Sequence, residues 1–169
     1  MKKLLLLFVY LISYYTIAQN GYPIPDSVSN RLFYIQHSNN HNTYVYDADI
    51  KKGVLNNDEP VIAYRIIYTR GGIKADLTGL QRRLAYGVKF KKIEDNSCVF
   101  TLAAYPEKEL FLRVTKKGRA YVMVNVNGKN LILSRMFLFS NKLGTKVDCI
   151  NFYGKDIKTG KNIVEKFYP

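Results

Sequence analysis

Short runs in which apolar and polar residues alternate dominate the chain from residue 31 onward. These runs are rich in Val, Ile, Tyr, Phe and Thr, and they are separated by Gly and Asn. Such a pattern is typical of half-buried β-strands joined by turns. Clear examples lie at residues 43–50, 62–68, 98–104 and 120–126. We therefore predict roughly nine or ten strands.

Two of the expected turns are marked by glycine. In VNVNGKNLIL (124–133), Asn127-Gly128 separates two apolar runs, and this dipeptide favours a tight hairpin turn because both residues tolerate positive φ. KDIKTGKNIVEKF (155–167) has a similar arrangement around Thr159-Gly160. The chain shows neither strand–helix–strand alternation nor an internal repeat. The expected fold class is all-β, with residues 19–169 forming a single antiparallel barrel or sandwich.

The stretch DLTGLQRRLAYG (76–87) has a helical period instead. Thr78 and Gln81 match a capping box, in which a hydroxyl and an amide satisfy free backbone groups at the start of a helix. Gly87 stands where a glycine commonly ends a helix. The sequence therefore predicts one short helix over residues 79–86.

The helical period also predicts which side of this helix is buried. At about 100° per residue, Leu80 and Leu84 are expected to face the core. Arg82 and Tyr86 are expected to face away from it, with Arg83 on the flank. The outer side would then present guanidinium groups and an aromatic ring to solvent.

The first residues, MKKLLLLFVYLISYYTIAQN, read as a secretory signal peptide. Lys2 and Lys3 precede an apolar core, and Thr16-Ile17-Ala18 resembles a cleavage site. We predict a signal peptide over residues 1–18 and export through the Sec pathway to the periplasm or the cell exterior. No cysteine lies near Ala18, so a lipoprotein is not expected. No later stretch approaches the ~18 apolar residues of a membrane-spanning helix.

The chain carries 26 basic and 13 acidic side chains, a formal net charge of +13. Residues 65–92 hold eight of the basic side chains against Asp76 alone. Such a charge favours an anionic glycan, a lipid head group or an envelope protein as partner, although lysine-rich composition alone produces the same excess. Nucleic acid is not the expected partner. The candidate ligand-binding residues are Gln81, Arg82, Arg83, Tyr86, Lys89 and His37.

Three stretches resemble one known family. LFYIQHSNNHNTYVYD (32–47), LTGLQRRLAYGVK (77–89) and VNGKNLIL (126–133) are similar to the exported bacterial proteins catalogued as domain of unknown function 4833. The chain departs from that family's pattern at His37, where an arginine is expected, and at Arg65, where a tryptophan is expected. The resemblance implies one exported domain and no particular reaction.

Both histidines, His37 and His41, lie close together in the first of these stretches. They bracket a polar turn between two strands, so they lack the helical spacing with which two imidazoles share a metal ion. Zinc would need a third or fourth ligand, and the nearest carboxylates, Asp47 and Asp49, lie well into the next strand. We predict turn histidines, no metal site and no cofactor. An acidic calcium loop and a glycosidase pair built on the two aspartates are likewise disfavoured.

No sequence signature of catalysis is present. The chain has no Gly-x-Ser-x-Gly, no P-loop, no dinucleotide-binding glycine motif and no cysteine beside a histidine. The leading hypothesis is a non-catalytic exported domain that binds an anionic or hydrophobic envelope ligand, or an envelope protein. The alternative is a small hydrolase-like envelope enzyme with a site near His37, Asp47 and Arg82.

Cys98 and Cys149 are the only cysteines. Cys98 shares a predicted strand face with Phe100 and Leu102, so its side chain is expected to point into the core. In an exported protein the two cysteines form either a disulfide or a pair of inert buried thiols, and the sequence leaves both open.

Overall fold

The structure is a computed structural model that describes residues 21–169. The predicted signal peptide, residues 1–18, lies outside the described residues. Strands occupy about 60% of these residues. Their bounds are β1 (Arg31–His37), β2 (Asn40–Ala48), β3 (Ile50–Lys51), β4 (Val54–Leu55), β5 (Val61–Ile67), β6 (Ile73–Asp76), β7 (Val88–Glu94), β8 (Ser97–Leu102), β9 (Tyr105–Val114), β10 (Ala120–Val126), β11 (Lys129–Ser140), β12 (Val147–Asp156) and β13 (Asn162–Phe167).

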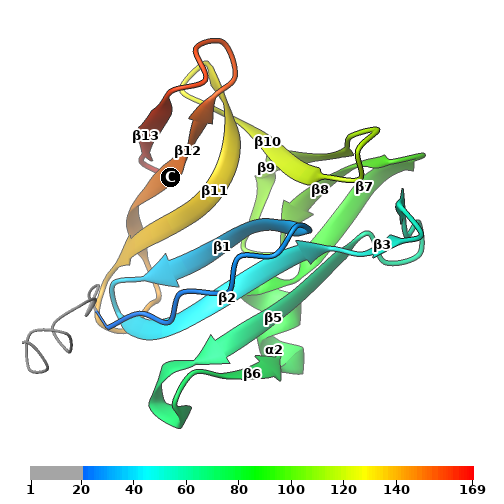
Figure 1. Cartoon of the computed structure of the whole chain (residues 1–169). Coiled ribbons are helices and arrows are strands. Elements are labelled where there is room, and N and C mark those ends of the chain that lie inside the picture. Colours follow the sequence, from blue (N-terminus) through cyan, green and yellow to red (C-terminus); the bar gives the residue numbers. More distant parts are fainter. Residues whose placement is uncertain (1–20) are drawn as a thin grey trace, which may run out of the picture.

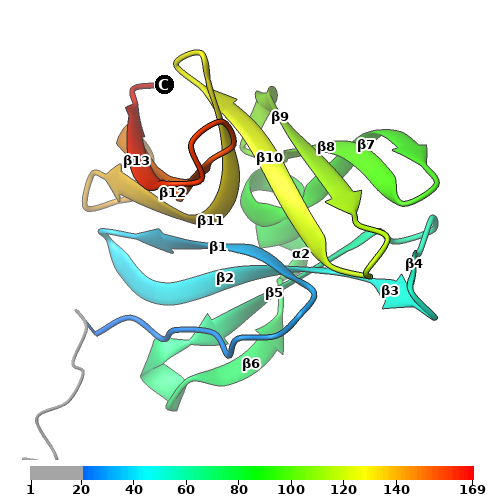
Figure 2. The same cartoon turned by 45° about the horizontal axis from the view of Figure 1, so that its top comes forward.

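Most strands form one 11-stranded sheet in the order β6-β5-β2-β1-β11-β10-β9-β8-β7, with β12 attached to β11 and β13 attached to β12. The long strand β11 is the junction. Its first half pairs with β10 and its second half pairs with β1, while β12 runs along its opposite edge. Two arms therefore diverge from one edge of β11, and they curl toward each other around the core (Figures 1 and 2).

The all-β prediction is confirmed, but the expected antiparallel barrel or sandwich is wrong. The sheet is mixed because β1 runs parallel to β11, and it curls into a half-barrel that does not close. The pairing of β11 with β12 shifts between Leu133 and Arg135, close to the point where the neighbour on the other edge changes from β10 to β1. Such an irregularity bends a strand and increases its twist. The main sheet also has more strands than the nine or ten expected, and β3 and β4 form a separate two-stranded ribbon.

A single hydrophobic core fills the concave side of the sheet. Phe33 of β1 stacks on Tyr46 of β2, with ring centroids 4.5 Å apart. Phe100 of β8 and Phe152 of β12 are fully buried in the same cluster. Each side chain of this size that leaves water contributes roughly 2–3 kcal/mol to folding, so both arms are held to one shared core.

The segment before β1 covers the outer face of the sheet, where it satisfies buried polar groups. The Pro23 carbonyl accepts hydrogen bonds from Thr43 Oγ1 at 2.6 Å and from Gln36 Nε2 at 3.3 Å. Tyr22 donates its hydroxyl to the His37 carbonyl at 2.6 Å. Figure 2 shows this segment crossing the strands on the side away from the core.

The glycine-marked hairpins are confirmed. Asn127 and Gly128, which link β10 to β11, have φ of 52° and 79°, as a tight hairpin turn requires. Gly160, between β12 and β13, has φ of 67°. At both positions the local sequence determines where the tight turn forms.

The predicted helix is also present, as a short α-helical turn, α2 (Gly79–Gln81), followed by a π-helical turn, η3 (Arg82–Tyr86). Both capping-box hydrogen bonds are formed, with Thr78 Oγ1 accepting from the Gln81 N–H at 3.2 Å and Gln81 Oε1 accepting from the Thr78 N–H at 3.1 Å. Within residues 21–169, no helix is long and apolar enough to cross a membrane.

The prediction of which side of this helical segment is buried is wrong. Leu80 and Leu84 are 60% and 58% exposed, whereas Tyr86 is partly buried and packs against the core. A π-helical turn takes more residues per turn than an α-helix, so an angular count at 3.6 residues per turn fails across it. Gly87 has an extended backbone, with a φ of −66°. A glycine is needed here because the Arg82 carbonyl group lies very close to it. A Cβ there would lie 1.8 Å from the Arg82 carbonyl oxygen.

Cys98 and Cys149 are both free and buried. Cys98 belongs to the core, as predicted, and burial raises the pKa of its thiol to about 12, so the thiol stays protonated. Cys149 is buried on β12 outside the core cluster. In the structure the two cysteines are buried thiols with no disulfide between them.

Candidate binding site at the open end of the half-barrel

The helical segment joins β6 to β7, the two strands at the ends of the sheet path. It therefore crosses the gap that the half-barrel leaves open between its arms. Leu77, just before the segment, is buried in the core. The Tyr46 hydroxyl donates a hydrogen bond to the Tyr86 carbonyl at 2.9 Å, which ties the end of the segment to β2.

Tyr86, at the end of this segment, packs with two side chains of the sheet, and we call the three residues the tyrosine–histidine cluster: His37, Tyr44 and Tyr86. The rings of Tyr44 and Tyr86 stack with centroids 3.5 Å apart at 13°, and the His37 ring meets both of them edge-on. His37 Nε2 lies 3.0 Å from the Tyr86 hydroxyl oxygen. Gln81, in the helical segment, also contacts the cluster, since its Nε2 lies 3.5 Å from the Tyr44 hydroxyl oxygen.

Burial keeps His37 and Tyr86 uncharged. Desolvation lowers the pKa of His37 to about 4, because an imidazolium is costly to remove from water. Burial, together with the nearby Tyr44, raises the pKa of Tyr86 above its usual value. At neutral pH the contact between His37 and Tyr86 is therefore a hydrogen bond between two neutral groups.

A cavity of about 250 Å³ opens beside the cluster. His37 and Tyr86 form part of its lining. The remaining walls are mostly apolar and come from β1, β8, β11 and β12, principally Ile35, Leu102, Met136, Leu138, Val147 and Ile150. Turns at one end of the curled sheet complete the rim, so the cavity occupies the mouth of the half-barrel. Mouths of β-barrels are common ligand sites.

The other side of the helical segment faces solvent. Leu80 and Leu84 lie one turn apart, and Arg83 stands beside them. We call these three residues the helix outer face. Arg82, on the flank, is also exposed. Neither arginine forms a salt bridge with any residue of 21–169.

A known protein family matches residues 33–166, which span almost all of the described fold. It is described as Domain of unknown function (DUF4833). The chain belongs to this family. Neither a curated protein nor a solved structure matches the chain.

In this DUF4833 chain the candidate residues separate into two groups. His37 and Tyr86 touch each other at the cavity, and Gln81 reaches the same cluster through Tyr44. Arg82, Arg83 and Lys89 are exposed and do not line the cavity. Sequence reasoning missed Tyr44 and Met136 as members of the site. The position of Tyr44 could have been predicted, because residues two apart in a strand point to the same face and Tyr44 therefore shares the face of Tyr46.

The geometry does not support the alternative hydrolase site. Asp47 lies on the outer face of the sheet, where it forms an ion pair with Arg31 and accepts a hydrogen bond from the Tyr64 hydroxyl at 3.2 Å. His37 points to the opposite face, toward the cavity. A strand sends alternate side chains to opposite faces, and the register of β1 and β2 places these two apart.

The acidic turn after β2 also has a structural role. Asp49 Oδ2 accepts a hydrogen bond from Asn56 Nδ2 at 2.7 Å and lies 3.5 Å from Lys51 Nζ. Both contacts hold the β3–β4 ribbon. Among residues 21–169, no three His, Cys, Asp or Glu side chains come together as a metal site would require.

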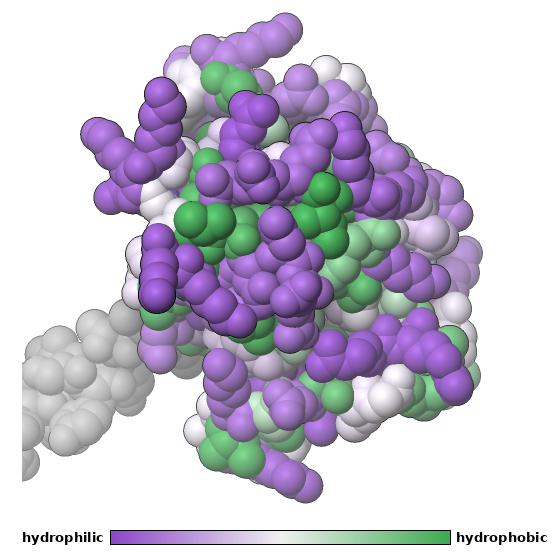
Figure 3. Space-filling model, turned by 90° about the vertical axis from the view of Figure 1, so that its right-hand side faces the viewer, coloured by the Kyte–Doolittle hydropathy of each residue, from purple (hydrophilic) through white to green (hydrophobic). Residues whose placement is uncertain are grey.

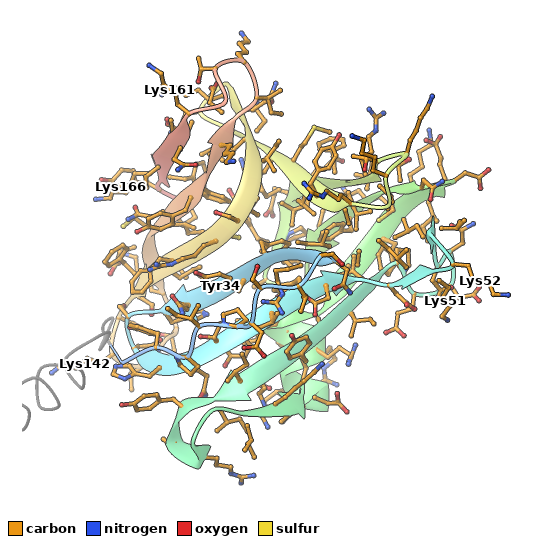
Figure 4. The ribbon with its side chains drawn as sticks, in the orientation of Figure 1. Tyr34, Lys51, Lys52, Lys142, Lys161 and Lys166 are labelled. Atoms are coloured by element: carbon orange, nitrogen blue, oxygen red, sulfur yellow. The ribbon has the colours of Figure 1, made fainter. Side chains whose placement is uncertain are left out.

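The positive charge of the protein is spread over its surface. Figure 4 shows Lys51 and Lys52 at one end of the molecule, Lys142 at another, and Lys161 and Lys166 on the β12–β13 hairpin. On the side drawn in Figure 3, hydrophilic side chains predominate and surround small hydrophobic groups. Net charge alone therefore does not locate a site. The helical segment carries two exposed leucines four residues apart together with two exposed arginines.

Proposed function

We propose that this protein is an exported domain that docks on anionic lipid head groups through the helical segment at residues 79–86. The observation that carries the proposal is the exposure of Leu80 and Leu84, 60% and 58%, beside Arg82 and Arg83. The signal peptide expected at residues 1–18 would bring the domain to an envelope membrane surface.

The leucines favour a lipid over a sugar. A helix that offers apolar side chains next to cationic ones is typical of segments that lie in the membrane interface, where the apolar groups enter the acyl boundary. Burying each leucine in this way would recover roughly 1.5–3 kcal/mol. A polysaccharide would leave both side chains in water. A two-turn segment supplies a weak contact, so we expect reversible association.

The arginines supply the selectivity for anionic lipid. Guanidinium forks bind phosphate oxygens bidentately, and those of Arg82 and Arg83 are not engaged in salt bridges within the described chain. A basic residue near an anionic leaflet contributes about 1 kcal/mol. Two such residues contribute about 2 kcal/mol, which corresponds to roughly a 30-fold change in binding.

Vesicle co-sedimentation tests this proposal. Residues 19–169, which contain the whole described fold, are mixed with phosphatidylcholine vesicles or with vesicles containing one-third phosphatidylglycerol. We expect binding to the anionic vesicles at low salt, weakened at 0.5 M NaCl because the charges are screened. Arg82→Gln/Arg83→Gln should weaken binding by about 30-fold, and Leu80→Ser/Leu84→Ser should weaken it on both kinds of vesicle.

Lys116→Gln/Lys117→Gln is the matched control. These two adjacent, exposed cations lie in the turn between β9 and β10, and their replacement changes the net charge equally. Binding should stay near the wild-type value. An equal loss in both double variants would overturn the proposal, because association would then depend on net charge alone. Absence of binding to anionic vesicles at low salt would overturn it as well.

A further inference from the structure

We propose that the cavity at the mouth of the half-barrel binds an uncharged, mainly hydrocarbon molecule that carries one hydroxyl or carbonyl oxygen. This site is separate from the helix outer face, and the proposal does not rest on lipid docking. Three properties of the cavity support it: its size, the absence of charge on its lining side chains, and the position of its hydrogen-bonding groups.

Size limits the occupant. The cavity measures about 250 Å³. An apolar cavity of roughly 150 Å³ accommodates benzene, so this one has room for about ten non-hydrogen atoms. That corresponds to a small molecule or to the end of a longer chain that leaves through the mouth.

The lining selects against charge. None of the side chains that line the cavity belongs to Lys, Arg, Asp or Glu. His37 is neutral at physiological pH, and burial raises the pKa of both Tyr86 and Tyr105. An ionic group placed inside would lose its hydration without meeting an opposite charge on a lining side chain, which costs several kcal/mol. A neutral occupant avoids this cost.

Two polar groups in the lining specify a hydrogen-bonding oxygen. His37 uses Nε2 in its contact with Tyr86, and Nδ1 has no partner within residues 21–169. A neutral imidazole that accepts the Tyr86 proton at Nε2 carries its own proton on Nδ1, and is then a donor for a ligand oxygen. Ser140, which also lines the cavity, has a buried hydroxyl without a partner in the described chain. Buried polar groups normally have partners, so such a position calls for a ligand or a water molecule.

The apolar walls define the rest of the molecule. Met136 and Leu138 of β11 and Ile150 of the adjacent strand β12 line the same cavity as His37, and Leu138 is the neighbour of His37 in the sheet. Methionine adapts to irregular shapes, which suits a flexible hydrocarbon better than a rigid polar ring. The preferred ligand class is thus a neutral alcohol, ester or amide with a hydrocarbon portion of about eight carbons.

The test uses 1-octanol, its anionic counterpart octanoate, and ethylbenzene, which has no oxygen. Each probe is titrated into ¹⁵N-labelled protein (residues 19–169) at pH 7.5, and amide shifts are followed by NMR. Octanol should give saturable shifts at residues around the cavity, such as Ala85, Leu102 and Leu138. Octanoate should bind at least tenfold more weakly. Equal or tighter binding of octanoate would overturn the proposal, as would octanol shifts that do not saturate or that map to the helix outer face.

A variant that fills the cavity gives an independent test. Val147→Phe places a larger ring at the cavity wall, whereas Val164→Phe makes the same change at a 52% exposed position on β13. Octanol shifts should disappear in the first variant and persist in the second. Persistence in both variants would show that octanol binds elsewhere, and would overturn the assignment even if lipid docking holds.

His37→Phe tests the hydrogen bond. It keeps an aromatic ring but removes both nitrogens, so octanol binding should weaken by about 2- to 10-fold. Ethylbenzene cannot use this hydrogen bond, and its affinity should be unchanged or increased. A parallel loss for both probes would indicate that His37 only shapes the cavity, and the specified oxygen would then be wrong.

Discussion

The two sides of one eight-residue segment have opposite characters. The side toward the barrel holds Tyr86 and Gln81 against His37 and Tyr44, in a neutral and tightly packed cluster. The side toward solvent exposes Leu80 and Leu84, between which the sequence places two arginines. Apolar residues thus lie outside and polar aromatic residues inside, which reverses the usual arrangement of a surface helix.

Because of this reversal, the residues that stabilise the fold differ from those proposed to contact lipid. Side chains that contact the cluster contribute to folding and shape the cavity, whereas the exposed leucines contribute little to folding because most of each side chain stays in water. Monomeric proteins expose single apolar side chains freely, but two on one helical turn flanked by arginines indicate an interaction surface. Replacements on the two sides should therefore affect different measurements.

The largest difference is expected between Tyr86→Ala and Leu84→Ala. Removal of the stacked Tyr86 ring leaves a gap beside Tyr44 and takes away the hydroxyl contact with His37, so the free energy of unfolding should fall by about 3 kcal/mol. Leu84→Ala should change it by less than about 0.5 kcal/mol, because the side chain is largely in water. Urea unfolding followed by circular dichroism gives both values. Equal losses would mean that Leu84 packs inward after all.

The pH dependence of stability sharpens the same comparison. The pKa of His37 is lowered to about 4 in the folded state, from about 6.5 when unfolded. Between these values the unfolded chain binds a proton that the folded chain does not, so stability is retained above pH 6.5 and is lost as the pH falls toward 4. At pH 5 this group alone should cost about 2 kcal/mol relative to pH 7.

His37→Gln should remove that component, and His41→Gln should retain it because His41 is exposed. The quantity to compare is the difference in unfolding free energy between pH 7 and pH 5 for each protein, since carboxylates contribute equally to all three. If the His37 variant keeps the wild-type difference, the imidazole is solvated and the cluster is not neutral at pH 5.

Local features of the fold were accessible from sequence because local chemistry determines them. The Asn127-Gly128 turn and the Thr78–Gln81 capping box are decided by a few neighbouring residues, and both are confirmed. The parallel contact of β1 with β11 was not accessible. It joins residues about a hundred positions apart, and alternation within a strand does not report which strand lies beside it.

Only part of the site could be predicted from the sequence, again because contacts between distant residues cannot be read from it. The basic residues were identified by charge, and His37 and Tyr86 were chosen as candidates, but only the fold shows that these two touch. The π-helical turn at Arg82–Tyr86 then rotates Tyr86 toward the core. Gly87, which admits the Arg82 carbonyl at a distance that no side chain would allow, resembles an ordinary helix-ending glycine in the sequence. No residue type marks such a turn in advance.

The smallest expected effect on stability concerns the Thr78 cap, at which the helical segment begins. Thr78→Ala removes the acceptor of the Gln81 N–H and should lower the free energy of unfolding by about 1 kcal/mol. Thr78→Ser keeps the hydroxyl and should restore most of that loss. Because tertiary contacts of Tyr86 hold the end of the segment, the Thr78→Ala variant should still bind octanol and anionic vesicles at close to wild-type strength. Loss of either activity without further loss of stability would show that the cap, rather than the cluster, orients the segment.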